Sequence, residues 1–158
     1  MKRDESLAPL SRQHHNALAL CVRIELALHS KEFHSEEWQA ETQRLFEAEI
    51  QHHFGAEEQV VFPVFAKAPS LAPVVQELLA EHQALRAYAA QAKERKLDRR
   101  KLAGFAAALA QHVRKEERAL FEEAQKLVAP QEMAEMGRRL EEFLRAAGGG
   151  AAACLLRD

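Results

Sequence analysis

The chain has 158 residues, of which 47% are apolar and 29% are charged, and its formal net charge is −2. This length favours one domain, and a near-neutral charge argues against nucleic acid as a partner. No apolar stretch reaches membrane-spanning length, no secretory signal is visible, and the two cysteines suit a reducing compartment, so we expect a cytoplasmic protein with no membrane partner. Helix-favouring residues dominate and threonine occurs once, which predicts an all-α fold.

The first predicted helix covers roughly residues 11–30, with Ser11 as a possible N-terminal cap. Its apolar stripe has helical spacing and carries Leu10, Leu18, Cys21 and Leu28. His14 falls in the middle of this stripe and is the better inward candidate. His15 lies about 100° further round the helix and stays an alternative, because the stripe is wide.

The second predicted helix begins near Ser35 as a cap and extends to about residue 67, with Pro63 expected to kink or end it. Its inward face is apolar except for three residues, namely Glu49, His53 and Glu57. Carboxylates on an apolar face are costly unless something buried neutralises them. This face is therefore the first indication of a bound cation.

Three more helices are predicted in the second part of the chain. One covers about residues 71–94 with His82 on its apolar face, and the next covers about 98–128, capped by Asp98, with His112 and Glu116 on one face. Pro130 can open a short C-terminal helix. Residues 147–158 are rich in glycine and alanine and are expected to form a flexible tail.

Two segments repeat the same pattern, HFGAEEQVVFP from His53 and HVRKEERALFE from His112. In each, a histidine precedes a glutamate by four residues, so both side chains leave the helix on one face. The preceding helices also match, since EHQALR around His82 is similar to QHHNALA around His14. Two similar helical hairpins predict an up-down-up-down four-helix bundle with an added C-terminal helix.

The chemistry of these residues predicts a metal site inside the bundle. Four imidazoles and two carboxylates can hold two ions, with each carboxylate able to bridge them. Imidazole with carboxylate suits iron, manganese or zinc better than calcium, which prefers oxygen alone. The candidate ligands are His14, His53, Glu57, His82, His112 and Glu116.

Together these motifs resemble the hemerythrin family, in particular the bacterial proteins with an HHE cation-binding domain. The resemblance covers residues 7–128 and places a hemerythrin-like domain at residues 1–146, before the tail at 147–158. It implies a non-haem di-iron centre held by the six candidate ligands, with the two irons bridged by Glu57, Glu116 and an oxo or hydroxo group.

The sequence also departs from the oxygen-carrying members of that family. They have a second histidine one turn after the one on the third helix, where this chain has Arg86, and an aspartate where it has Glu117. Because an imidazole is lost, Glu49 or Glu81 can be considered as an additional ligand. We interpret Glu58 and Glu117 as helix-flank residues facing basic side chains such as Arg114 and Arg118, with metal binding as the alternative.

The functional hypothesis is a di-iron protein that binds or reacts with oxygen, peroxide or nitric oxide. The departures from the oxygen carriers put reversible oxygen carriage in doubt and favour sensing or handling of such a small oxidant. We expect a binding or sensing protein rather than an enzyme. The alternative is a metal-binding storage or sensor module without turnover, holding iron or zinc.

Overall fold

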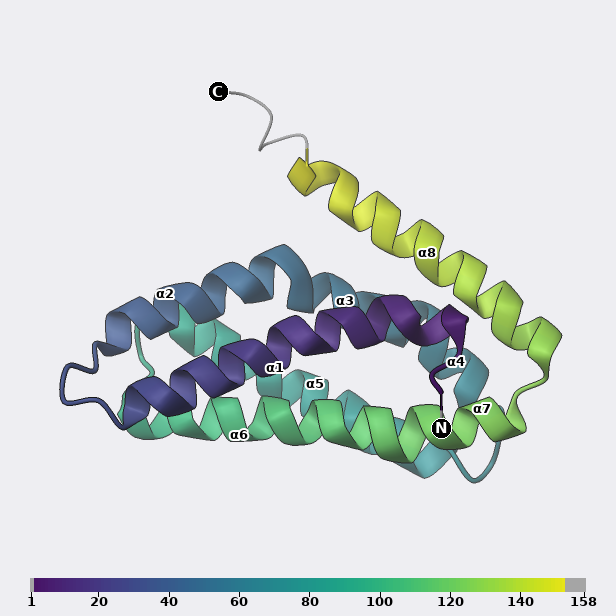
Figure 1. Ribbon diagram of the computed structural model, residues 1–158, viewed down its shortest axis with the longest axis horizontal. Helices are drawn as coiled ribbons and strands as arrows, with labels where there is room; N and C mark the ends of the chain where they lie inside the picture. The colour runs from purple at the N-terminus through teal and green to yellow at the C-terminus, as the bar shows by residue number, and fades with distance from the viewer. Residues whose placement is uncertain (1, 153–158) are drawn as a thin grey trace.

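The computed structural model describes residues 2–152, and it confirms the all-α bundle (Figure 1). Four long helical rods run antiparallel, and the second and the fourth contain π-helical segments. The first rod is η1 (Glu5–Leu7) and α1 (Ala8–Leu28); the second is α2 (Ser35–Leu45), η2 (Phe46–Ile50), α3 (Gln51–Ala56), η3 (Glu57–Val61) and α4 (Phe62–Phe65). The third rod is α5 (Ala72–Lys93), the fourth is α6 (Arg99–Lys115), η4 (Glu116–Phe121) and α7 (Glu122–Leu127), and α8 (Pro130–Ala152) follows. None of the helices within residues 2–152 combines the length and apolarity needed to cross a bilayer.

The helix starts show which local signals are decisive. Asp98 caps α6 as predicted, since its side chain accepts a hydrogen bond from a backbone N–H of the first turn. Ser11 is not a cap, because α1 begins three residues earlier with Pro9 in its first turn, where a missing N–H is tolerated. Ser35 is already the first residue of α2. Pro63 falls in the first turn of α4, so the rod continues to Phe65.

The core has two apolar clusters separated by a polar layer. One cluster lies where α4, α7 and α8 meet and includes Phe62, Phe65 and Phe121. The other fills the opposite part of the bundle and includes Phe54 and Phe105. Along α1, Leu10 belongs to the first cluster and Ala17 to the second, and His14 lies between them. The candidate ligands therefore occupy the layer between two dry clusters.

The C-terminal helix α8 crosses the bundle obliquely (Figure 1). It packs closely because of two glycines: a Cβ at Gly137 would come within 2.6 Å of the Ser6 side chain, and Gly55 on α3 faces the ring of Phe143. Helix α8 is longer than the short helix predicted, and it continues to Ala152, past the expected start of the tail at residue 147. Residues 153–158 of that tail lie outside the described residues.

Candidate metal centre

Six buried polar side chains meet in the middle of the bundle. Each rod supplies one histidine, and the second and fourth rods each add a glutamate from the first residue of a π-helical segment. These residues are His14, His53, Glu57, His82, His112 and Glu116, and none is more than 5% exposed. They form two groups of four that share both glutamates. We call His14 and His53 with the two carboxylates half-site 1, and His82 and His112 with the same carboxylates half-site 2.

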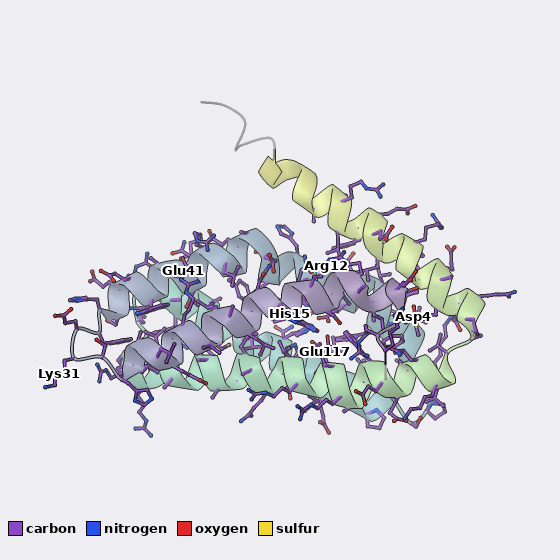
Figure 2. All side chains as sticks on the ribbon, in the orientation of Figure 1. Asp4, Arg12, His15, Lys31, Glu41 and Glu117 are labelled. Carbon is purple, nitrogen blue, oxygen red and sulfur yellow. The ribbon has the colours of Figure 1, made fainter. Side chains whose placement is uncertain are left out.

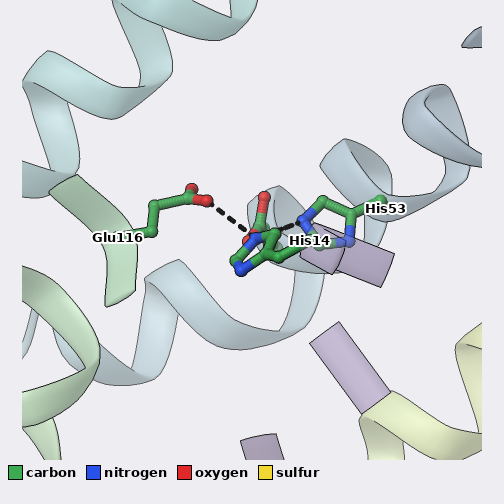
Figure 3. A group of neighbouring side chains, drawn as sticks. His14, His53 and Glu116 are labelled. Atoms are coloured by element: carbon green, nitrogen blue, oxygen red, sulfur yellow. Dashed lines mark hydrogen bonds and ion pairs between the residues drawn. The ribbon is translucent and has the colours of Figure 1, made fainter. Parts of the chain in front are cut away.

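In half-site 1, the donor atoms face one another at short range (Figure 3). The Nε2 atom of His14 lies 3.0 Å from Nε2 of His53 and 3.1 Å from Oε2 of Glu116. The Nε2 atom of His53 lies 3.2 Å from Oε1 of Glu57. Two nitrogens that bind one ion at about 2.1 Å and roughly a right angle are about 3 Å apart. The separation of the two imidazoles therefore fits a shared cation.

In half-site 2, the same carboxylates present their other oxygens. The Nε2 atom of His82 lies 3.3 Å from Oε2 of Glu57, and Nε2 of His112 lies 3.2 Å from Oε1 of Glu116. Each glutamate thus directs one oxygen to each half-site. This is the arrangement that a carboxylate bridging two ions requires.

The hydrogen bonding of the six residues is incomplete without a cation. Within residues 2–152, all four carboxylate oxygens of Glu57 and Glu116 lack a hydrogen-bond partner, as does Nε2 of both His82 and His112. Buried polar atoms without partners cost several kcal/mol, and buried charges cost more. Because these atoms converge on two points, one cation in each half-site would satisfy them together.

The other nitrogen of each imidazole points away from the centre and is held by a second residue. The four pairs join Nδ1 to a side-chain oxygen at similar distances: His14 to Glu117 at 2.7 Å, His53 to Gln13 at 2.8 Å, His82 to Glu58 at 2.8 Å and His112 to Glu81 at 2.8 Å. An ionised carboxylate only accepts hydrogen bonds, so Nδ1 carries the hydrogen and Nε2 keeps its lone pair for a metal.

Three of these four holding residues are carboxylates that are paired with a cation of their own, and the fourth is an amide. The pairs are Arg3 with Glu117, Arg86 with Glu58, and Lys115 with Glu81. Gln13, which holds His53, is uncharged and half-buried. Three imidazoles are therefore fixed through ion pairs, and His53 is fixed only through an amide.

The π-helical segments explain how adjacent glutamates take different roles. A π turn contains more residues than an α turn, so successive side chains are separated by a smaller angle. In η3, Glu57 faces the centre while Glu58 reaches His82 on the third rod, and in η4 Glu116 faces the centre while Glu117 reaches His14 on the first. Each segment thus supplies a central carboxylate and an outer one.

The sequence model of the family described as hemerythrin HHE cation binding domain matches residues 6–124. This chain belongs to the hemerythrin family. No curated protein and no solved structure gave a significant match. All six central residues and their four holding residues lie within the matched range, so the match and the geometry both identify a cation-binding domain.

Three other residues of this hemerythrin domain were considered as metal ligands, and the structure places all three outside the central group. His15 is exposed, with Nδ1 2.8 Å from the carbonyl oxygen of Ser11, so His14 is the inward residue. Glu49 accepts hydrogen bonds from Asn16 outside the centre. Glu81 holds His112 from behind rather than joining the central group.

Arg86, at the position where oxygen-carrying hemerythrins have another histidine, has a different contact. Its guanidinium makes two hydrogen bonds to Glu58, at 2.7 and 3.1 Å, and it lies over the ring of Phe54. That ring stacks on His82 at a centroid distance of 3.8 Å. The side chain at position 86 therefore anchors the surroundings of His82 instead of contributing a donor atom.

Sequence reasoning missed the holding residues in part. Glu58 and Glu117 do face arginines, but Arg114 and Arg118 are both exposed and the observed partners are Arg86 and Arg3. Gln13 was not singled out at all. A signal was available, because a polar residue precedes the histidine on the first and third rods (Gln13-His14, Glu81-His82), and a second glutamate follows each central one.

The buried charges of the centre shift the pKa values of its groups in opposite directions. Burial lowers the pKa of His14, but the nearby carboxylates of Glu116 and Glu117 outweigh burial and raise it to about 9. The same balance raises the pKa of His82 to about 9 and that of His112 to about 10. Burial would raise the pKa of Glu116, but the surrounding imidazoles hold it well below its usual range. Protons on the imidazoles thus balance the carboxylates when no cation is bound.

Proposed function

We propose that this hemerythrin domain is a non-haem di-iron protein that binds or reacts with oxygen or a related small oxidant. The observation that carries the proposal is the sharing of Glu57 and Glu116, since each directs one oxygen to each half-site. Two ions held this way are close enough to act on one small molecule. Family membership supports iron, and the mixed nitrogen and oxygen donors suit it.

Iron would supply redox chemistry and a position for an external ligand, because each half-site offers only four protein donors. The residues of the chain prepare that chemistry. The outer carboxylates fix the tautomer and orientation of three imidazoles, and a fixed, basic imidazole binds a metal more tightly. The cations behind those carboxylates, such as Arg86 behind Glu58, keep them ionised.

Aromatic side chains keep water away from the centre. Phe54 and Phe62 stack on His82, with ring centroids 3.8 and 5.5 Å away, and Phe121 stacks on His14 at 5.8 Å. A small cavity of about 10 Å³ borders His14 and His53 of half-site 1 and His112 of half-site 2. Its other lining residues are Gln13 and five apolar ones, namely Ala17, Ile50, Phe54, Leu109 and Val113, and its exposed surface is almost entirely apolar. A water molecule needs two to four polar partners, and little polar surface faces this cavity, so it favours a small neutral ligand.

Metal analysis and reaction with oxygen test this proposal. We expect the purified chain, loaded anaerobically with ferrous iron, to hold two irons and to develop the near-ultraviolet absorption of a coupled ferric pair when oxygen is added. A single bound ion, or binding of zinc with no uptake of iron, contradicts the proposal. Two irons that never react with oxygen, peroxide or nitric oxide support the storage module instead.

A further inference from the structure

Gln13 lies between the metal centre and an open groove on the surface. The groove has a volume of about 360 Å³ and lies between α1 and α8, lined among others by Arg12, Asn16 and Arg145. Figure 2 shows Arg12 on the stretch of α1 beneath α8. Gln13 lines both this groove and the small apolar cavity beside His53. Its side chain therefore lies between the solvent-filled groove and the cavity that borders half-site 1.

Gln13 is also the least firmly held of the four residues behind the imidazoles. Its oxygen accepts one hydrogen bond, from Nδ1 of His53 at 2.8 Å. The other three, Glu58, Glu81 and Glu117, each join an imidazole to a basic side chain. Displacing one of them would break an ion pair as well as a charge-assisted hydrogen bond, which is stronger than a neutral one. Displacing Gln13 breaks only a neutral hydrogen bond.

The size of the cavity indicates that such a displacement is needed. A volume of about 10 Å³ corresponds to roughly one water-sized probe, so a diatomic molecule fits only if the cavity expands. The remaining walls are rigid, because Phe54 and Leu109 are at most 1% exposed and belong to the packed core. Gln13 is the wall that borders open space and can rotate into the groove.

We propose that Gln13 is the gate through which a small neutral ligand passes from the α1–α8 groove to half-site 1. The nature of the ligand rests on the proposed function, whereas the route rests on the two cavities and their shared wall. Helix α8 forms one side of the entrance and lies beyond residue 124, where the family match ends. One side of the entrance is therefore built by a part of this chain outside the hemerythrin match.

The rate of nitric oxide binding to the iron-loaded chain tests the gate. Gln13→Ala removes the wall, and because a binding step that waits for a conformational change is slow, we expect association to become about five times faster or more. Gln13→Glu keeps an acceptor for His53 and places a carboxylate between Arg12 and Arg145, so association should become slower. Asn16→Ala, which alters the groove and the contact with Glu49 but not the small cavity, should stay within about twofold of the unmodified chain.

Glu81→Gln measures the effect of a neutral imidazole partner by itself, because it gives His112 the kind of partner that His53 has; Glu81 lines neither cavity, although His112 borders the smaller one. If Glu81→Gln changes the association rate as much as the Gln13 variants do, the effect comes from the imidazole partner and the gate is refuted. Equal rates for Gln13→Ala and the unmodified chain refute it as well.

A second measurement needs no metal and separates this proposal from the proposed function. Dissolved oxygen under pressure is paramagnetic and speeds the relaxation of nearby methyl groups in nuclear magnetic resonance spectra. In the metal-free full chain, Gln13→Ala should at least double this enhancement at Ala17 and Ile50, which line the cavity, and leave Val61 in the other apolar cluster unchanged. Unchanged enhancement at Ala17 and Ile50 overturns the gate even if no iron binds.

Discussion

Half-sites 1 and 2 are built alike and differ in the charge of one of the residues that hold the imidazoles. In each, a histidine from an unbroken helix and a histidine four residues before a central glutamate approach the same pair of carboxylates. The difference lies behind the imidazoles, because His53 is held by the neutral Gln13 and His112 by Glu81, which is paired with Lys115. A repeated hairpin thus gives a pair of similar candidate cation positions. We expect the half-site with the amide to hold a cation more weakly and to open more easily than the half-site with the carboxylate.

Loss of a shared carboxylate should have the largest effect, because it breaks both half-sites at once. We expect Glu57→Gln to reduce the metal content from two ions per chain to nearly none, since an amide neither bridges two ions nor balances their charge. Metal analysis after loading checks this. Glu47→Gln, on the exposed side of the same rod, should retain both ions, and two ions in Glu57→Gln would disprove the shared role.

Loss of one histidine should empty only the half-site to which that histidine belongs. His53→Ala removes a donor from half-site 1 only, and His112→Ala removes one from half-site 2 only, so each variant should retain about one ion. His52→Ala is the matched control, because His52 is the neighbour of His53 and is not part of the central group. A content of two ions in either ligand variant would show that the assignment of the ligands is wrong.

Alkaline pH should destabilise the metal-free protein, because the imidazoles of the centre then lose their protons. A pKa raised in the folded state stabilises the fold fully below the unfolded value near 6.5, and this stabilisation is lost as pH rises through the folded pKa. The folded values are about 9 for His14 and about 10 for His112. Between pH 7 and pH 10 we expect losses of about 3 kcal/mol for such an imidazole, or roughly 6–12 °C in melting temperature.

Thermal unfolding of the metal-free and metal-loaded proteins across this pH range is the measurement. Bound cations replace the protons, so the loaded protein should keep a nearly constant melting temperature over the same range. A metal-free protein that is equally stable at pH 7 and pH 10 would contradict the proton balance described for the centre.

Exchanging an amide and a carboxylate behind the imidazoles should have the smallest effect on metal binding. It tests most directly whether this one difference distinguishes the two half-sites. Glu81→Gln makes half-site 2 resemble half-site 1, and we expect its metal affinity to fall by about 10-fold, the lower end of the effect of such partners. Gln13→Glu should raise the affinity of half-site 1. Competition with a chelator for cobalt or zinc measures both. Equal affinities in the unmodified chain would show that the amide makes no difference.

The fold and the central residues were predictable because local spacing encodes them. The histidine and glutamate of HFGAEEQVVFP and of HVRKEERALFE share a helix face whatever the rest of the chain does, and the repeat points to their meeting. The antiparallel bundle follows from amphipathic helices joined by short connections. The structure brings all six predicted candidates together.

The holding residues were not predictable in the same way, because their contacts depend on how the rods pack. Glu117 and His14 are 103 residues apart, and Gln13 and His53 are 40 apart. Helical periodicity places Glu58 and Glu117 on a flank, whereas in the structure both lie in π-helical segments and reach a histidine of another rod. The role of Arg86 likewise depends on a contact between the second and third rods.

The close packing of α8 against η1, which Gly137 permits, has a practical consequence for work with this protein. Met133, Met136 and Leu140 of α8 are buried in the same cluster as Leu7 and Val61. A chain shortened to the matched residues 6–124 would present that apolar surface to water, and large exposed apolar patches promote aggregation. Expression trials, crystallisation and metal titrations should therefore retain the chain through residue 152.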